Sequence, residues 1–158
     1  MRRWALYLIC GVVPGCQCSK PEGDSVATSP YSLSILEVTP CPASPEVDTG
    51  RVRLVGVKVR IVGHHPRGVP ANYFYASLLT TDQNRYLADY AGCSPRLSGK
   101  PLAPGEAAEG YLNFPVPVGK VPDKLVYAAA LGGQHEGSST VELRLANASP
   151  VATNAEER

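Results

Sequence analysis

Apolar and polar residues alternate with a period of two over most of the chain between residues 31 and 145. This period places alternate side chains on opposite faces of a strand, as in antiparallel sheets that bury one face and expose the other. No stretch shows the apolar spacing of a helix. The inward sets are expected to be Tyr31, Leu33 and Ile35; Val55, Val57, Val59 and Ile61; Phe74, Ala76 and Leu78; Gly110, Leu112 and Phe114; and Val141, Leu143 and Leu145.

The joints between these expected strands are rich in proline and glycine, of which the chain has 15 each. Both residues favour turns, and they cluster at sites such as Pro66-Arg67-Gly68, Pro104-Gly105 and Gly132-Gly133. Short strands separated by such turns within one compact region are typical of sandwiches. The sequence therefore predicts an all-β fold, an antiparallel β-sandwich over residues 31–145.

The first residues have the order of a bacterial lipoprotein export signal. Two arginines precede an apolar run, Trp4 to Val13, that is too short to span a bilayer permanently. The small Gly15 then precedes Cys16, so a peptidase cutting between them would leave Cys16 to carry a lipid. Residues 1–15 are predicted to be this signal. An ordinary secretory signal, cut nearby, is the alternative, because Pro14 departs from the usual pattern.

Lipidation would anchor the protein to a membrane at the cell envelope. Gln17 follows the expected lipidated cysteine, where an aspartate retains some lipoproteins in the inner membrane, and this favours an outer membrane facing the periplasm or exterior. Residues 16–30 are polar, lack apolar periodicity and are expected to form a flexible tether. Residues 146–158 are similarly polar and are expected to form a disordered tail.

Export also changes the interpretation of the five cysteines, because an oxidising compartment favours disulfides over metal thiolates and catalytic thiols. Cys10 would leave with the signal, Cys16 would be acylated, and Cys18 would remain in the tether. Cys41 and Cys93 lie in turn-like settings within the folded region. They are predicted to form a disulfide, which would stabilise the fold by roughly 3 to 4 kcal/mol in the chain-entropy model.

Charge and motif content argue against two classes of function. The 15 lysines and arginines are interleaved with 14 acidic residues, so there is no clustered basic face for nucleic acid. The sequence has no Gly-x-Ser-x-Gly elbow, no activated-cysteine context and no paired carboxylates at a catalytic spacing. The protein is therefore expected to have no catalytic residues and no cofactor.

Histidine ligation of a metal is the main chemical alternative. His64, His65 and His135, with Glu136 or Asp82, offer side chains that bind zinc or copper. Adjacent histidines point to opposite sides of an extended chain, so His64 and His65 could share an ion only if their segment turns. A periplasmic metal-binding or carrier protein remains a second hypothesis.

Tyrosines suggest a contact surface. Tyr73, Tyr75 and Tyr111 fall on the strand faces that the alternation directs to solvent. Large amphipathic side chains at such positions either pair with cross-strand neighbours or contact a protein or glycan partner. Both interpretations stay open at this point.

A motif beginning Leu102-Ala-Pro-Gly-Glu106, followed by Gly110, Phe114 and Val116-Pro117, carries a resemblance to a known family. It is similar to the telokin-like immunoglobulin-fold domain of bacterial extracytoplasmic lipoproteins, a domain of unknown function whose fold is related to a mycobacterial secreted immunogenic protein. That family also has a preceding valine-rich strand, a hairpin and a later Leu-Val-Tyr strand. The corresponding residues here are Val55 to Val62, Thr81 to Tyr86, and Leu125-Val126-Tyr127.

The resemblance implies an immunoglobulin-like sandwich that binds rather than catalyses. Within the motif, turn chemistry at Pro104 and Gly105 is a sufficient explanation of the Pro-Gly-Glu sequence, with Glu106 opening the next strand. In the hairpin, Asn84 stands where the family has a glycine, and asparagine tolerates the left-handed turn conformation nearly as well as glycine does. The sequence as a whole predicts a cell-envelope lipoprotein that acts as a non-catalytic binding or structural module.

Overall fold

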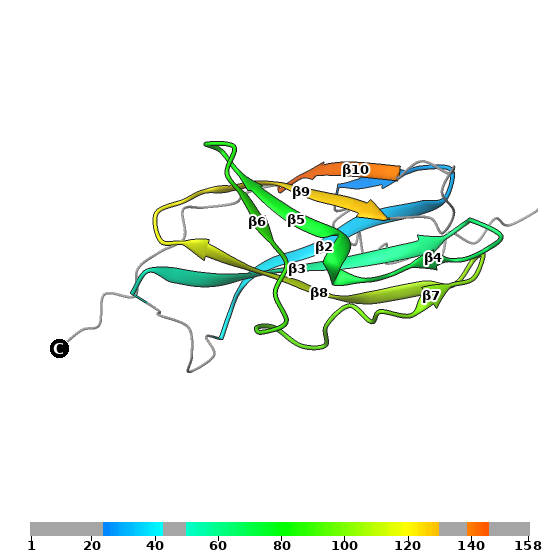
Figure 1. Ribbon diagram of the computed structural model, residues 1–158, viewed down its shortest axis with the longest axis horizontal. Coiled ribbons are helices and arrows are strands. Elements are labelled where there is room, and N and C mark those ends of the chain that lie inside the picture. The colour runs from blue at the N-terminus through cyan, green and yellow to red at the C-terminus, as the bar shows by residue number, and fades with distance from the viewer. Residues whose placement is uncertain (1–23, 43–49, 130–138, 146–158) are drawn as a thin grey trace, which may run out of the picture.

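The computed structural model describes residues 24–42, 50–129 and 139–145, and these form an antiparallel β-sandwich, which confirms the predicted fold class (Figure 1). The first sheet has the order β1-β2-β3-β8, the second has the order β10-β9-β5-β6, and β4 pairs with β7. The bounds are β1 Ser25–Ala27, β2 Tyr31–Cys41, β3 Val52–Gly63, β4 Val69–Pro70, β5 Ala76–Thr80, β6 Arg85–Leu87, β7 Pro101–Leu102, β8 Ala107–Pro117, β9 Pro122–Ala129 and β10 Ser139–Arg144.

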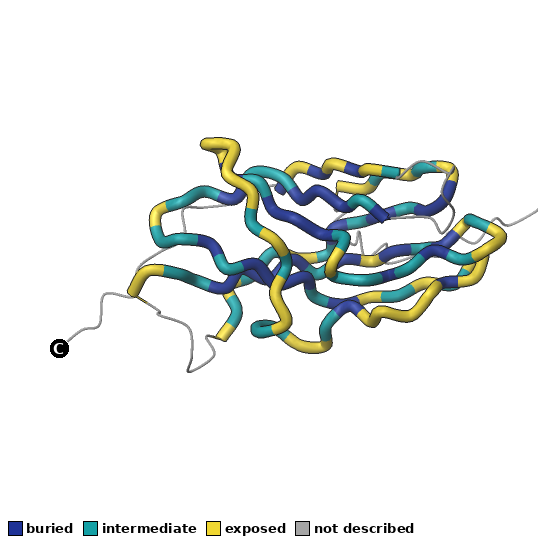
Figure 2. The backbone as a smooth tube through the Cα atoms, in the orientation of Figure 1, coloured by how far each residue is buried: buried dark blue, intermediate teal, exposed yellow. Residues whose placement is uncertain are grey.

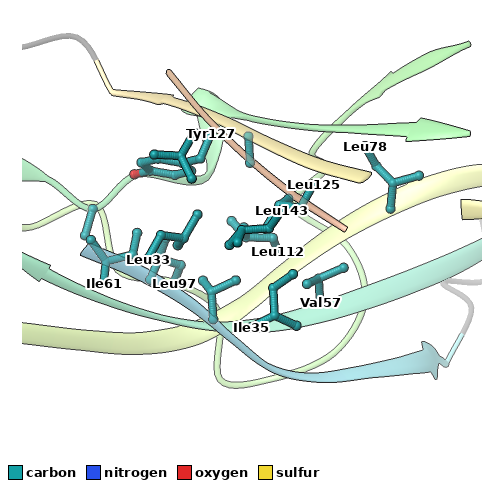
Figure 3. Packing of buried hydrophobic residues seen from close by; sticks show 14 of the residues in the cluster. Leu33, Ile35, Val57, Ile61, Leu78, Leu97, Leu112, Leu125, Tyr127 and Leu143 are labelled. Atoms are coloured by element: carbon teal, nitrogen blue, oxygen red, sulfur yellow. The ribbon is translucent and has the colours of Figure 1, made fainter. Parts of the chain in front are cut away.

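The core lies between the two four-stranded sheets, where the alternating apolar positions meet. Leu33 and Leu112 from the first sheet and Leu125 from the second are fully buried and point into the same space (Figure 3). Buried positions recur along β2, β3, β8, β5 and β9, whereas the turns are exposed (Figure 2). Removing these side chains from water supplies the main driving force for folding. Within the described ranges, no helix is long and apolar enough to cross a membrane.

Two buried tyrosines join the sheets. The rings of Tyr31 and Tyr127 make an edge contact at 5.7 Å between centroids. The Tyr31 hydroxyl donates to the carbonyls of Tyr127 (3.1 Å) and Ser139 (2.7 Å). The Tyr127 hydroxyl donates to the Pro70 carbonyl (2.9 Å) and accepts from the Asn72 amide (3.1 Å). Burial raises the pKa of both phenols, and the paired hydroxyls avoid the cost of a buried unsatisfied polar group.

The expected strand alternation fails just before β5. Residues Tyr73–Tyr75 form a short 3₁₀ helix, η1, whose first turn is capped where the Asn72 side-chain oxygen accepts from the Phe74 amide (3.1 Å). The inward position predicted for Phe74 is wrong, since its side chain is 72% exposed, while Tyr73 and Tyr75 pack against the core. A 3₁₀ turn has three residues per turn instead of two, so it exchanges the faces that a strand would assign.

The ordered sheet begins before residue 31. β1 pairs with β2 through Ser25↔Ser34, so this strand lies inside the segment expected to be a tether. In the β5–β6 hairpin, Gln83 rather than Asn84 has the positive φ, 64°, so the left-handed residue lies one position before the asparagine. Asn84 instead donates its side-chain amide to Asp82 (2.7 Å).

Asp82 organises the same hairpin by binding several neighbours. Its carboxylate accepts from the Thr80 hydroxyl (2.6 Å) and pairs with the Lys120 ammonium from the loop between β8 and β9. The hydrogen bond from Lys120 is the main cause that lowers the pKa of Asp82 to about 2. The hairpin is thus fastened to the end of the sandwich by a surface ion pair, whose contribution to stability is small at such exposed positions.

Gly110 permits a close approach of the backbone of residues 95–97 to the outer edge of β8. The Tyr111 amide donates to the Pro95 carbonyl (2.9 Å), and the Leu97 amide donates to the Tyr111 carbonyl (3.1 Å). Leu97 then inserts its side chain into the core, where it is 3% exposed. A Cβ on Gly110 would overlap the Leu97 nitrogen and lie 2.5 Å from the carbonyl carbon of Arg96. The backbone there can pass only over a residue without a side chain.

Replacing Gly110 by alanine should therefore destabilise the fold by about 1 to 3 kcal/mol, through overpacking against backbone. Urea denaturation followed by circular dichroism measures this loss. Gly99→Ala is the matched control, because a Cβ there would meet its nearest neighbour, the Asn72 side-chain nitrogen, at an ordinary 3.5 Å. Equal stability of the two variants would contradict the assignment of Gly110 as a packing requirement.

Candidate functional site

Residues 89–97, here called the edge segment, run from β6 in the second sheet to the outer edge of β8 in the first. The Asp89 amide donates to the Asn113 carbonyl (2.7 Å), and the bonds between Pro95, Tyr111 and Leu97 continue the contact. These bonds satisfy edge groups of β8 that a partner strand would otherwise occupy. The edge segment therefore links the two sheets, and its exposed residues are Asp89, Tyr90, Ser94 and Pro95.

The predicted disulfide is confirmed: Cys93 of the edge segment is bonded to Cys41 at the end of β2, with Cα atoms 5.0 Å apart. β3 lies between β2 and β8, so the bond must pass over β3. Gly56 makes this possible, because a Cβ there would overlap Cys41 Sγ and come within 3.0 Å of Cys93 Sγ. The bond closes a sequence separation of 52 residues, which corresponds to roughly 3 to 4 kcal/mol in the chain-entropy model.

Asn113 is the second anchor of the edge segment. Its side-chain oxygen accepts from the Cys93 amide (3.1 Å), and its side-chain nitrogen donates to the Cys93 carbonyl (3.2 Å). The strand alternation places Asn113 on the face directed to solvent, yet it is only 1% exposed because the edge segment covers it. Gly92 approaches so closely, at φ +130°, that a Cβ there would lie 2.6 Å from Asn113 Cγ. The disulfide and this amide together hold Cys93 in one place.

The edge segment and η1 bring exposed apolar side chains to one region. Among the described residues, the exposed large hydrophobic side chains are Phe74 (72%), Leu87 (70%) and Tyr90 (64%). Tyr73 connects two of them, with its ring 4.2 Å from that of Phe74 and 6.4 Å from that of Tyr90. The guanidinium carbon of Arg96 lies 3.1 Å from the centroid of the Tyr90 ring. We name Tyr73, Phe74, Tyr90 and Arg96 the aromatic surface.

The three tyrosines predicted from the sequence as a possible contact surface, Tyr73, Tyr75 and Tyr111, do not lie together. Tyr73 belongs to the aromatic surface but is partly buried, and Tyr75 packs with its ring 6.3 Å from Tyr127. Tyr111 lies on the outer face of the first sheet, where its hydroxyl donates to a Glu37 carboxylate oxygen (3.0 Å). That hydrogen bond is the main cause that raises the pKa of Tyr111. Tyr111 thus pairs within its own sheet.

Sequence reasoning missed Phe74, Tyr90 and Arg96. The alternation assigned Phe74 to the interior, and Tyr90 and Arg96 lie in an irregular segment with no periodic signal. The available clue was composition: Asn72 to Tyr75 contains three consecutive aromatic residues, and Tyr90 falls three positions before Cys93. Once the disulfide is known, it places Tyr90 on a fixed segment rather than a free loop.

The histidines predicted as metal ligands are only partly described. His64 and His65 both donate their backbone amides to the Pro30 carbonyl (2.8 and 3.1 Å), and the His65 side chain accepts from the Arg67 amide (3.3 Å). His135 lies outside the described residues. In the ranges 24–42, 50–129 and 139–145, no three His, Cys, Asp or Glu side chains gather to hold a metal. Metal binding stays a prediction.

The Pro-Gly-Glu motif has the structural role expected of it. Gly105 has φ +82°, and the Glu106 carboxylate accepts from the Ala103 amide (3.1 Å) and from the Lys100 ammonium (2.8 Å). The hydrogen bond from Lys100 is the main cause that lowers the pKa of Glu106. This carboxylate closes the turn that opens β8.

Comparison with known proteins finds relatives only at the level of the fold. No protein-family profile and no curated protein sequence matches the chain. Several solved structures share the fold. The Bacillus subtilis protein ycdA, a candidate lipoprotein, has a TM-score of 0.61 at 19% identity over 77% of this chain. MPT63, a secreted protein of Mycobacterium tuberculosis, has 0.56 at 12% over 78%, and B. subtilis yjhA has 0.58 at 12% over 78%.

The matched region corresponds to 38% of ycdA, 94% of MPT63 and 96% of yjhA. This chain therefore spans well under half the length of ycdA but nearly the full length of the other two. None of these comparisons indicates an enzyme family.

Asn113→Ala should free the edge segment while leaving the disulfide in place. The change leaves the Cys93 amide and carbonyl without partners, at an expected cost of about 1 to 3 kcal/mol. Hydrogen exchange at the Cys93 amide should become faster, and mass spectrometry without reductant should still find Cys41 bonded to Cys93. Glu109→Ala, on the same face of β8 and half-exposed, should change stability by less than about 0.5 kcal/mol. Unchanged exchange at Cys93 would show that Asn113 does not anchor the segment.

Proposed function

We propose that this protein is a lipid-anchored, immunoglobulin-like module of the cell envelope that binds a partner through its aromatic surface without catalysis. The observation that carries the proposal is the connected group of exposed rings, Phe74 and Tyr90 with Tyr73 between them. Clustered exposed aromatic side chains mark contact sites. Binding removes a large apolar area from water, while few rotatable side-chain bonds lose their freedom.

The aromatic surface is held rigidly, which favours binding. η1 is capped by Asn72. The edge segment is fixed by the disulfide and by the Asn113 side chain, which binds both the backbone amide and the carbonyl of Cys93. Segments ordered before binding lose little further conformational entropy in the complex. Aromatic anchors on fixed segments are the usual centres of binding energy.

An extracytoplasmic location is supported by three independent features. The signal-like residues 1–15 precede Cys16, the disulfide suits an oxidising compartment, and the fold is shared with a secreted protein and a candidate lipoprotein. The motif around Leu102 to Glu106 adds the resemblance to the telokin-like domain of envelope lipoproteins. No sequence motif supports chemistry on the bound partner.

The strand order also suits a tethered binding module. β1, which follows the N-terminal segment, lies at one edge of the first sheet and packs against β10. β6, which leads into the edge segment, lies at the opposite end of the second sheet's strand order from β10 (Figure 1). An anchor that enters at the β1–β10 side therefore leaves the edge segment, with Tyr90 and Arg96, on the other side.

Lipid attachment is tested by metabolic labelling with an alkyne fatty acid in the native cell. The label should be lost in Cys16→Ser and kept in Cys18→Ser, since only Cys16 follows a small residue at the expected cleavage site. Label that persists in Cys16→Ser, or no label in the unaltered protein, would remove the lipid anchor from the proposal.

Contact through the aromatic surface is tested by crosslinking in the native envelope. A photoreactive phenylalanine analogue at position 74 should give one dominant crosslinked species. The same analogue at Glu142, an exposed position on β10 at the other end of the second sheet, should give only background. Capture equal to background at position 74, in protein that retains its disulfide and melting temperature, would contradict a contact surface there.

A further inference from the structure

The aromatic surface has two chemically different ends. Phe74 is at one end and is largely exposed, with one neighbouring ring, Tyr73, supporting it. Tyr90 follows, and the Arg96 guanidinium is stacked on its ring at the other end. A ligand that covered the surface would contact the apolar Phe74 ring at one end and the Arg96 cation at the other.

Arg96 has binding capacity that its stacking does not use. Stacking engages the flat face of a guanidinium, while its N–H donors lie along the edges of the plane. Within the described part of the chain, no carboxylate pairs with Arg96 or with Arg85 on neighbouring β6. Bidentate pairing with a carboxylate is the geometry that these edge donors fit best.

The acidic residue that lies closest to Arg96 in the sequence, Asp89, has another role. One carboxylate oxygen of Asp89 accepts from the backbone amides of Tyr90 and Ala91. Asp89 therefore fixes the backbone that carries Tyr90, while Arg96 stacks on that ring. The edge segment positions both the ring and the cation.

We propose that the aromatic surface binds a carboxylate-bearing glycan, with a sugar ring stacked on Phe74 and a carboxylate paired with Arg96. The inference rests on the proposed function and names its ligand class. One face of a pyranose ring presents mainly C–H groups, which pack on an aromatic ring, while its substituents remain hydrated. A carboxylate in the same chain would complement the edge donors of Arg96.

The extent of the surface favours a narrow chain over a broad protein interface. A standard protein–protein interface covers about 800 Å² on each partner, with a continuous apolar centre. Here the connected rings come from two short segments, and the outer faces of the sheets carry charge pairs such as Arg60–Glu109 and Lys124–Glu142. A glycan strand needs only a few stacked rings and one or two polar contacts.

The test uses four probes at equal carboxylate or sugar content, with binding measured by isothermal titration calorimetry on the exported chain purified in detergent. An oligogalacturonate supplies sugar rings with carboxylates, a chitin hexasaccharide supplies neutral rings, and polyglutamate supplies carboxylates without rings. Soluble peptidoglycan glycan chains, stripped of their stem peptides so that the lactyl carboxylates are free, serve as a second acidic glycan. At least one acidic glycan should bind, and the neutral glycan and polyglutamate should bind at least about tenfold more weakly, because each lacks one of the two interactions.

Variants then locate the site. Phe74→Ala and Arg96→Gln should each weaken acidic-glycan binding by about tenfold, and raising the salt concentration should weaken the unaltered protein more than Arg96→Gln. Arg144→Gln on β10, an exposed arginine at the other end of the second sheet, is the matched control and should bind normally. Unchanged melting temperature and an intact disulfide show that each variant is folded.

The inference is overturned if neither acidic glycan binds, if polyglutamate binds as tightly, or if Phe74→Ala and Arg96→Gln have no more effect than Arg144→Gln. Tight binding of polyglutamate would indicate an acidic peptide as the partner. Crosslinking of a protein at position 74, together with no glycan binding, would retain the proposed contact surface and reject the glycan. The two hypotheses can thus fail separately.

Discussion

The disulfide between Cys41 and Cys93 is the interaction on which the arrangement of the surface depends. It reaches over an intervening strand, and that strand carries a glycine, Gly56, directly beneath the sulfur atoms. The bond fixes an irregular segment that would otherwise be an ordinary loop between two sheets. Asn113 completes the attachment by binding both backbone groups of Cys93. Because the same segment contains Tyr90 and Arg96, a covalent bond on one face of the sandwich determines where these two side chains lie.

Glycines have two distinct roles in this arrangement. At Gly105 the backbone needs a positive φ, and any side chain there would be strained. At Gly56 and Gly110 the requirement is space, since a sulfur atom or a peptide group occupies the position of the missing Cβ. In the core, Tyr31 and Tyr127 bury both ring and hydroxyl, and the hydroxyl groups of both phenols are hydrogen-bonded. The sandwich therefore combines a tightly packed core with glycines at the positions where another part of the chain comes close to a strand.

The sequence predicts the fold class well and the candidate site poorly, for the same physical reason. A period of two reports which face of a strand meets the core, so the inward positions Leu33, Val57 and Leu112 are buried as expected. The two cysteines could be paired because the export that the sequence predicts leaves few alternatives for them. The period says nothing once the backbone leaves the strand conformation, and η1 reversed the faces of Tyr73 and Phe74. The edge segment has no period at all, and its burial of Asn113 is a long-range effect that local sequence does not encode.

The edge segment also affects how copies of the protein meet one another. A β-sheet can grow by adding a strand at an open edge, and two copies of a protein can pair through such edges. In the first sheet, one edge is the three-residue β1, and the other, along β8, is occupied by residues 89–97 and interrupted by Pro115 and Pro117. A neighbouring copy thus finds little backbone with which to pair at the edges of this sheet. The disulfide that positions Tyr90 and Arg96 therefore has a second effect. It keeps the edge segment on β8, where this segment prevents strand addition by another copy and so favours solubility.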